Sequence, residues 1–362
     1  MKNILLILVG GTICTALNES GTLSVSEKAG AKLKADFLNS DSPYKNEVNI
    51  DLSENLFILS ENMTVNAWNK VIETYRKYTK EKQYDGIIFA HGTDTLGFSA
   101  SLFSMILSDT KIPVFFVSAN ARLDSPRSNG TINFKSAVEL ICMGIPANVY
   151  AVYKNVSDGR IYLHLGSRLT QCKNYSDDFY SVGAMDISDI SKENCCGYFD
   201  KIKSNYPADK RESFVDINDD WSLKECVLMI DPYVGINYDA FDYSRFKAVL
   251  HGTYHSGTAC VEKTAHYSEY SKNSILYMID RCSGATTPVD VYFSPSTLKG
   301  EIYETVETVS RHNADSITPT EFLYGFTKET AYAKLLLAYS IFGDKCDRLK
   351  FIKTQCNFEK IV

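Results

Sequence analysis

The sequence of 362 residues contains no apolar run near the roughly 18 residues that a membrane-spanning helix requires. Its first apolar stretch covers only residues 4–9 and leads directly into Gly10 and Gly11. This stretch is too short for the apolar core of a secretion signal and is typical of a buried first strand. We therefore expect no membrane segment and a cytoplasmic protein.

An excess of basic residues is also missing. Lys and Arg total 38 against 44 Asp and Glu, which gives a net charge of −6 without a basic stripe or tail. This charge disfavours a nucleic-acid partner. With 44% hydrophobic and 23% charged residues, the chain is not expected to be disordered, and its length allows two domains.

No two of the ten cysteines have the CxxC spacing of a zinc or redox site. Without an export signal, free thiols in a reducing compartment are expected. His251 and His255 are four residues apart, but they lack the intervening Glu of a zinc-protease helix and stand beside Gly252 and Gly257. The sequence therefore predicts no catalytic metal and no cofactor.

Short apolar runs alternate with amphipathic stretches through the first half of the chain. This order predicts a parallel sheet with crossover helices. Ile87, Ile88 and Phe89 are continuously apolar, which is typical of a strand covered by helices on both faces. The predicted strands are 4–9, 86–90, 113–117 and 149–153, and the predicted helices are 65–80, 98–107 and 132–143.

A polar stretch with few periodic apolar positions divides the chain. We predict an N-terminal catalytic α/β domain over 1–190, with a doubly wound, mostly parallel sheet, and an interdomain linker over 191–222. A smaller C-terminal α/β domain is predicted over 223–362, with no internal repeat. Its predicted elements are strands at 226–230, 246–250 and 275–279, and a long helix at 319–342.

Polar residues follow three predicted strands, where parallel sheets bind ligands. The segments are Gly10-Gly11-Thr12-Ile13, His91-Gly92-Thr93-Asp94-Thr95 and Ser118-Ala119-Asn120. Hydroxyls beside a carboxylate suggest nucleophilic catalysis by a threonine, and the glycines allow a tight turn near a developing oxyanion. Each segment alone has a simpler interpretation, as a turn or as a helix cap by Asp94. A dinucleotide site is disfavoured because GxGxxG spacing is absent.

Together, the GGTI and HGTDT segments resemble the bacterial-type L-asparaginase/glutaminase family, most closely its cytosolic type I members. The resemblance covers nearly the whole chain. It also includes Ser60-Glu61-Asn62-Met63-Thr64 with Trp68, Arg127-Ser128-Asn129-Gly130, Arg281-Cys282-Ser283-Gly284 and Ala333-Lys334-Leu335.

The resemblance implies a role for each matching residue. Thr12 would be the nucleophile that forms an acyl-enzyme and releases ammonia, and Thr93 would activate water together with a lysine. Asp94 would bind the α-ammonium group of the substrate, Ser60 its α-carboxylate, and the backbone at Ala119 its amide. The family also implies a homodimer or homotetramer with a small-molecule amide substrate.

The sequence departs from the family at the lysine and at a loop tyrosine. In the family, the catalytic lysine follows a Gly-x-Arg segment, which is Gly166-Ser167-Arg168 here. Gln171 lies nearer the position expected for that lysine, and Lys173 falls just after it. We take Lys173 as the catalytic lysine because it follows the expected position directly. The pKa of a lysine that is desolvated beside a threonine can be lowered towards neutrality, so that it can accept the threonine proton. The loop after the nucleophile normally supplies a tyrosine in this family. Residues 15–25 contain no tyrosine, and Thr22 occupies the corresponding position.

Two further departures concern the substrate. Glu61 replaces a neutral polar residue, and its carboxylate would repel an α-carboxylate and favour an amine. In the segment 251–258, which is similar to a loop that other members contribute to the site, Thr258 replaces an asparagine. His255 in this segment either contacts substrate or has no catalytic role.

The sequence favours hydrolysis of L-asparagine to L-aspartate and ammonia. The same chemistry on L-glutamine, a D-amino-acid amide or a peptide amide is an alternative, as is ammonia delivery to a partner synthetase, as in the tRNA-amidotransferase subunits of the family. The partner alternative is weakened because no extra N-terminal domain is evident. A non-catalytic amino-acid-binding homologue is the third alternative.

Overall fold

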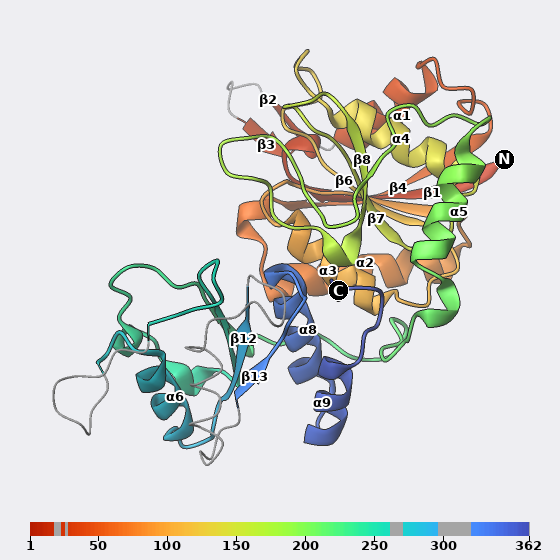
Figure 1. Cartoon of the computed structure of the whole chain (residues 1–362). Coiled ribbons are helices and arrows are strands. Elements are labelled where there is room, and N and C mark those ends of the chain that lie inside the picture. Colours follow the sequence, from red (N-terminus) through yellow and green to blue (C-terminus); the bar gives the residue numbers. More distant parts are fainter. Residues whose placement is uncertain (18–22, 26–27, 261–270, 296–319, 362) are drawn as a thin grey trace. The chain divides into compact units, whose positions relative to one another are not determined.

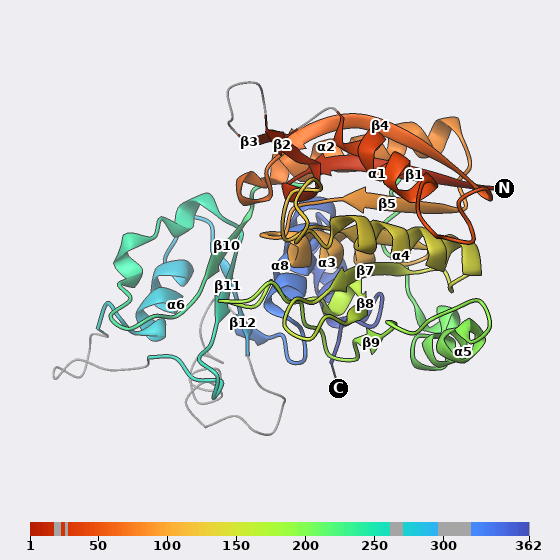
Figure 2. The same ribbon diagram turned by 90° about the horizontal axis from the view of Figure 1, so that it is seen from above.

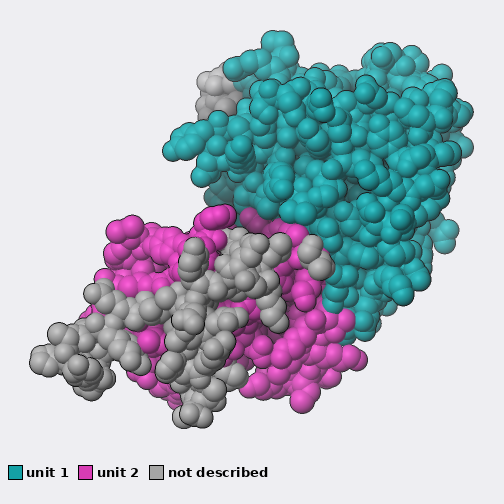
Figure 3. Space-filling model, viewed as in Figure 1, with its two compact units in different colours: residues 1–220, 355–358 teal, residues 221–354, 359–362 magenta. Residues whose placement is uncertain are grey.

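The computed structural model describes residues 1–17, 23–25, 28–260, 271–295 and 320–361. The chain forms two compact units (Figure 3). Unit 1 comprises residues 1–220 and 355–358, and unit 2 comprises residues 221–354 and 359–362. The segment predicted as a linker, 191–222, contains helix α5 (Cys195–Asn205), and most of it groups with unit 1.

Unit 1 is built on a seven-stranded sheet with the order β4-β1-β5-β6-β7-β8-β9 (Figure 2). The strands from β4 to β7 are parallel, whereas β8 and β9 are antiparallel to their neighbours. This arrangement confirms the predicted mostly parallel α/β fold. The strands are β1 (Lys2–Gly10), β4 (Val48–Ile58), β5 (Gly86–Ala90), β6 (Val114–Val117), β7 (Val149–Lys154), β8 (Ile161–Leu165) and β9 (Met185–Asp186), with a separate ribbon of β2 (Thr15–Leu17) and β3 (Leu23–Val25).

Helices cover both faces of this sheet (Figure 1). Helices α1 (Ala29–Leu38) and α4 (Gly130–Met143) lie on one face, and α2 (Val65–Glu81) and α3 (Leu96–Ile106) lie on the other. On the second face, the ring of Phe89 in β5 stacks 6.4 Å from Tyr75 of α2 and lies 4.9 Å from Phe103 of α3. The strands read as continuous apolar runs because both of their faces are buried.

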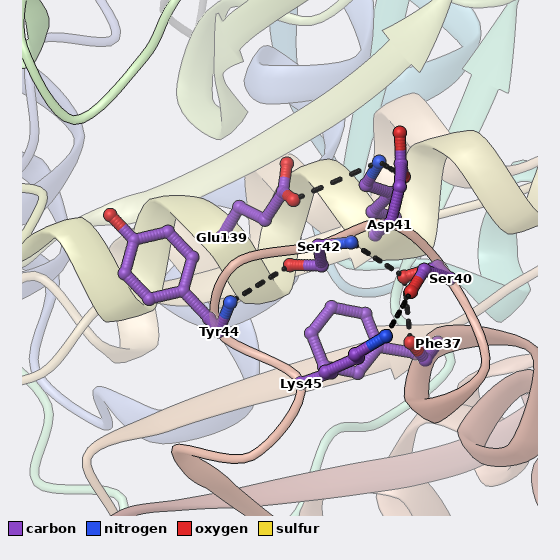
Figure 4. Close-up of polar contacts among 8 residues, drawn as sticks. Phe37, Ser40, Asp41, Ser42, Tyr44, Lys45 and Glu139 are labelled. Carbon is purple, nitrogen blue, oxygen red and sulfur yellow. Dashed lines mark hydrogen bonds and ion pairs between the residues drawn. The ribbon is translucent and has the colours of Figure 1, made fainter.

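Hydrogen bonds and ion pairs fix the connection from α1 to β4 (Figure 4). The Ser40 hydroxyl donates at 2.7 Å to the Phe37 carbonyl at the end of α1, which also accepts from the Ser40 N–H at 3.0 Å. Lys135 of α4 pairs with Asp41 in this connection and lies 3.9 Å from Glu139 of its own helix. These contacts tie the end of α1 to α4 on the same face of the sheet.

Unit 2 contains a second, four-stranded parallel sheet with the order β10-β11-β12-β13. The predicted α/β class of the C-terminal half is therefore confirmed. Its elements are β10 (Val227–Ile230), β11 (Ala248–Gly252), β12 (Asp290–Ser294), β13 (Thr320–Phe322), α6 (Ile275–Ser283), α8 (Lys328–Ile341) and α9 (Lys345–Lys353). Short 3-10 helices in the chain are η1 (Thr12–Cys14), η2 (Ser60–Asn62), η3 (Gly166–Arg168), η4 (Ala208–Lys210), η5 (Tyr238–Ala240) and η6 (Tyr243–Arg245).

The predicted strand at 275–279 is wrong, because this segment begins helix α6. The side chain of Ser274 accepts a hydrogen bond from the Leu276 N–H and caps the helix. Ile275, Ile279 and Cys282 are buried at a helical spacing. A short apolar run does not distinguish a buried strand from a buried helix, and the Ser274 cap favours the helix.

The predicted helix at 319–342 begins too early. Residues Thr320–Phe322 form strand β13, and helix α8 begins only at Lys328. Thr327 caps it by accepting from the Thr330 N–H. None of the helices in the described part of the chain is long and apolar enough to cross a membrane.

Candidate active site

The carboxyl end of β1 turns sharply at two glycines. Gly10 has φ of 139° and Gly11 has φ of 74°, which L side chains rarely adopt. A Cβ on Gly10 would lie 2.1 Å from the carbonyl oxygen of Ile58 at the end of β4. The turn is held by the Thr15 hydroxyl, which donates to the Gly11 carbonyl at 2.8 Å. It presents Thr12, a partly exposed residue, as the first residue of η1.

The end of β1 touches the end of its parallel neighbour β5. A Cβ on Gly11 would lie 2.2 Å from the Cα atom of Gly92, so only glycine allows this approach. Thr12 follows the first of these glycines, and Thr93 follows the second. The structure thus brings the GGTI and HGTDT segments together at one sheet edge.

The end of β4 adds Ser60 to this edge. The Ser60 hydroxyl donates to Oδ2 of Asp94 at 3.0 Å, and the Asp94 N–H donates back to the Ser60 hydroxyl oxygen at 3.3 Å. The Thr95 hydroxyl donates to the Ser60 carbonyl at 3.0 Å. Ser60 is buried, whereas Asp94 and the neighbouring Glu61 are exposed. Ser60 therefore directs its only hydroxyl proton at Asp94 and orients that carboxylate.

A buried hydrogen-bond chain that the sequence analysis missed supports the HGTDT segment. His91 Nδ1 lies 2.8 Å from the Gly92 carbonyl, and its Nε2 lies 2.9 Å from the Ser99 hydroxyl. Ser99 in turn accepts from Trp68 Nε1 at 2.9 Å. Burial lowers the pKa of His91 to about 4, so the ring is neutral at pH 7. Because a carbonyl only accepts, Nδ1 donates to Gly92 and Nε2 accepts from Ser99.

This chain of hydrogen bonds fixes the Gly92 carbonyl group, which directly precedes Thr93. Its members come from α2, α3 and the end of β5, and no local motif in the sequence connects them. A histidine at a strand end was the only available signal.

The end of β6 carries the third predicted segment. Ala119 is fully buried, and a Cβ on Gly130 at the start of α4 would lie 2.7 Å from the Ala119 Cβ. The Asn120 N–H donates to the Asn129 side chain at 2.9 Å, and the Asn129 N–H donates to the Asn120 side chain at 3.0 Å. Asn133 also donates to the Ser118 carbonyl at 2.8 Å. These bonds fix the backbone on both sides of Ala119.

The segment after η3 places Gln171 and Lys173 in different surroundings. The side-chain amide of Gln171 donates to the Asp94 carbonyl and so contacts the HGTDT segment. Lys173 is exposed, and its backbone N–H donates to the Asp178 carbonyl at 2.9 Å. The catalytic role of Lys173 stays a prediction.

The remaining predicted residues lie elsewhere. Thr22 is outside the described residues. The segment 251–258 belongs to unit 2, where His251 is fully buried between the Gly252 carbonyl and the Tyr238 hydroxyl, and His255 is exposed. Across the described ranges, no group of three or more His, Cys, Asp or Glu side chains could hold a metal ion.

These features define a two-unit α/β protein with hydroxyl and carboxylate groups at the carboxyl ends of parallel strands. The chain belongs to the asparaginase family. The sequence model described as "Asparaginase, N-terminal" matches residues 3–200, which includes all of the strand ends described above.

Curated relatives are named as D subunits of glutamyl-tRNA(Gln) amidotransferase. The protein from Archaeoglobus fulgidus is 28% identical over 294 residues, which cover 78% of this chain and 65% of the relative. The protein from Methanobrevibacter smithii is 27% identical over 244 residues, which cover 67% of this chain and 53% of the relative. The chain thus spans between half and two thirds of these relatives.

Solved structures of similar fold include two L-asparaginases. The enzyme from Thermococcus kodakarensis superposes with a TM-score of 0.70 at 18% identity, over 100% of this chain and 99% of that one. L-asparaginase I from Vibrio cholerae gives a TM-score of 0.66, also at 18% identity and with the same coverage. At this identity, the likeness concerns the fold alone.

Proposed function

We propose that the protein is an amidohydrolase that releases ammonia from a carboxamide through an acyl-threonine intermediate. One observation carries this proposal. The close approach of Gly11 to Gly92 brings the ends of β1 and β5 together, and Ser60 at the end of β4 orients Asp94 beside them. The hydroxyl groups of Thr12 and Thr93 and the carboxylate of Asp94 thus belong to one edge of the sheet, which supports their proposed roles as nucleophile, second hydroxyl and substrate-binding group.

In the proposed reaction, Thr12 Oγ1 attacks the carbonyl carbon of the amide and loses its proton to a base. The tetrahedral intermediate collapses with transfer of a proton to the amide nitrogen, so that ammonia leaves and an ester to Thr12 remains. Thr93 then assists a water molecule that attacks the ester, which releases the carboxylic acid and restores Thr12. The backbone at Ala119 contacts the amide group of the substrate.

The charges at the site favour a substrate with an ammonium group. Asp94 and Glu61 are both exposed and carry carboxylates, and Ser60 holds one oxygen of Asp94 in place. Each carboxylate attracts an α-ammonium group and repels an α-carboxylate. We therefore propose that Asp94 binds the α-ammonium group of the substrate, and that Glu61 disfavours a free amino acid whose α-carboxylate lies close to it.

L-asparagine and L-glutamine both carry the side-chain amide and the α-ammonium group that this proposal requires. The curated relatives are named as amidotransferase subunits, which supports L-glutamine, with ammonia passed to a partner protein, over hydrolysis of free L-asparagine. The family resemblance also supports a homodimer or homotetramer. Whether the protein acts as a homo-oligomer or with a partner protein, the amide chemistry is proposed to take place at Thr12.

Ammonia release from a panel of amides tests this function. The panel comprises L-asparagine, D-asparagine, L-glutamine and a peptide amide, each supplied to the purified full chain. We expect turnover of L-glutamine or L-asparagine, and the ratio of the two kcat/KM values identifies the substrate. If no amide releases ammonia but one of them raises the melting temperature, the protein binds amino acids without turnover and the proposal is wrong.

Substitution of Lys173 tests the proposed proton acceptor. If Lys173 accepts the Thr12 proton, Lys173→Met is expected to lower kcat by at least about 10²-fold, the usual contribution of a general base. Gln171→Ala removes the contact with the Asp94 carbonyl and is expected to change KM more than kcat. Lys192→Met, at another position of unit 1, serves as the matched control. A kcat in Lys173→Met equal to that of Lys192→Met would exclude Lys173 as the base.

A further inference from the structure

The chain returns to unit 1 near its carboxyl terminus. Residues 355–358, which we call the tail segment, belong to unit 1, whereas the residues on both sides of them belong to unit 2. Lys334 of α8 contacts both flanking residues, because its ammonium group donates to the Thr354 carbonyl at 2.7 Å and forms a buried ion pair with Glu359. A single side chain thus holds the two ends of the tail segment.

Hydrogen bonds hold the tail segment within unit 1. Asn357 is fully buried, and its side-chain amide donates to the Ser104 carbonyl of α3 at 3.0 Å and to Oδ1 of Asn148 before β7 at 2.7 Å. The Cys356 carbonyl accepts from the Glu212 N–H at 2.9 Å. Burial raises the cost of breaking such hydrogen bonds, so the tail segment is held firmly in this position.

The last two carbonyl groups of the tail segment bind η3. The Ser167 hydroxyl donates to the Asn357 carbonyl at 2.6 Å, and Nε of Arg168 donates to the Phe358 carbonyl at 2.6 Å. Phe358 has φ of 56°, and its ring packs edge-on against Tyr206 at 5.4 Å. A residue other than glycine keeps such a backbone conformation only where the surrounding contacts enforce it. Successive residues of η3 are thus each bound to the tail segment.

The residues that follow η3 contact the HGTDT segment. A Cβ on Gly97, in the first turn of α3, would lie 3.1 Å from the carbonyl oxygen of Thr170 and 3.0 Å from Oε1 of Gln171. The chain therefore passes close over the beginning of α3. There the side-chain amide of Gln171 donates to the Asp94 carbonyl, directly before that helix.

We propose that the tail segment is a positioning element of the candidate active site. It holds η3 through Ser167 and Arg168, and η3 holds the side chain of Gln171 on the Asp94 carbonyl. A glutamine side chain has several rotatable bonds, so its amide keeps this contact only if the backbone that carries it is fixed. The inference rests on the proposed role of Asp94 in binding the α-ammonium group, and it makes Asn357 a positioning residue for substrate binding.

Ser167→Ala tests this series of contacts, because it removes only the hydroxyl group that binds the tail segment. With the best amide of the panel, it is expected to raise KM about two- to tenfold, the effect of one hydrogen bond, with kcat nearly unchanged. In the Gln171→Ala background it is expected to have no further effect on KM, because it acts through Gln171. Effects on KM that multiply in the double variant would overturn the proposal, and so would an unchanged KM in Ser167→Ala.

A control and a second variant accompany this test. Ser42→Ala is the matched control, because Ser42 is also buried in unit 1 and its hydroxyl accepts from the Tyr44 N–H at 3.3 Å. It is expected to leave KM unchanged. Asn357→Leu releases the tail segment from α3 and is expected to raise KM at least as much as Ser167→Ala. Thermal melting shows whether Asn357→Leu is folded, and Ser167→Ala decides the test if it is not.

Hydrogen exchange without substrate separates this proposal from the proposed function. Ser167→Ala is expected to speed exchange of the amides of 166–171, and Ser42→Ala is not. Unchanged exchange in Ser167→Ala would overturn the positioning role, whether or not the protein releases ammonia. Faster exchange in a protein that releases no ammonia would overturn the proposed function, while it would support the role of the tail segment in holding η3.

Discussion

Thr12→Ala is expected to lower the rate of ammonia release at least about 10³-fold, because removal of a catalytic nucleophile commonly abolishes most of the rate enhancement. The fold should survive, since Thr12 is only partly buried and the turn before it is held by backbone geometry and by Thr15. Steady-state assays with the best amide of the panel measure the effect. Thermal melting checks that the variant is folded.

Thr12→Ser is the matched control for this experiment, because it keeps the hydroxyl and removes only a methyl group. It is expected to retain measurable turnover and to form the same ester, which mass spectrometry of the protein after rapid acid quenching would detect as an added acyl mass. Turnover by Thr12→Ala close to that of the unmodified protein would show that another residue attacks the amide. In that case Thr93 would be the next hydroxyl to test.

The second large effect concerns stability. Lys334 of α8 and Glu359 near the carboxyl terminus form an ion pair in which both side chains are fully buried. Lys334 also donates to the Thr354 carbonyl at 2.7 Å and lies 5.0 Å from the centre of the Phe351 ring. Lys334→Met is expected to destabilise unit 2 by about 3–5 kcal/mol, because it leaves the Glu359 carboxylate buried without its cation.

Urea unfolding followed by circular dichroism, with hydrogen exchange of the α8 amides, measures this loss. The matched control is Lys328→Met in the same helix, because Lys328 pairs with Asp231 on the surface, at 38% and 52% exposure. Its loss should cost no more than about 1 kcal/mol. The double variant Lys334→Met with Glu359→Gln should regain part of the stability, since it removes the unpaired charge. Equal effects of the two lysine variants would contradict this account.

Much of the fold could be predicted from the sequence because its signals are local. Continuous apolar runs such as Ile87-Ile88-Phe89 identify strands buried on both faces, and amphipathic stretches identify the helices between them. The prediction of a strand at 275–279 was wrong, because an apolar run of five residues is too short for its periodicity to distinguish a strand from a helix. The cap at Ser274 was a local signal that could have corrected it.

The candidate site was predicted in part for the same reason. Gly10-Gly11 and Gly92 predict tight turns before Thr12 and Thr93, and the hydroxyl groups that follow these glycines suggest nucleophilic catalysis by a threonine. The commitment of the Ser60 hydroxyl to Asp94 had no local signal, because the two residues are brought together only by the pairing of β4 with β1 and of β1 with β5. The sequence therefore named these residues but not their partners.

By itself, the sequence determined the fold class, the glycine turns and the residues that are proposed for the site, since strands, turns and short motifs are each recognised from residues that are close in the chain. Only the tertiary structure decided that Gln171 contacts the Asp94 carbonyl and that residues 355–358 belong to unit 1. It also decided that burial keeps His91 neutral while its ring donates to the Gly92 carbonyl. These features depend on burial and on hydrogen bonds between residues far apart in sequence. Such contacts form only when the packed core brings distant segments to one place.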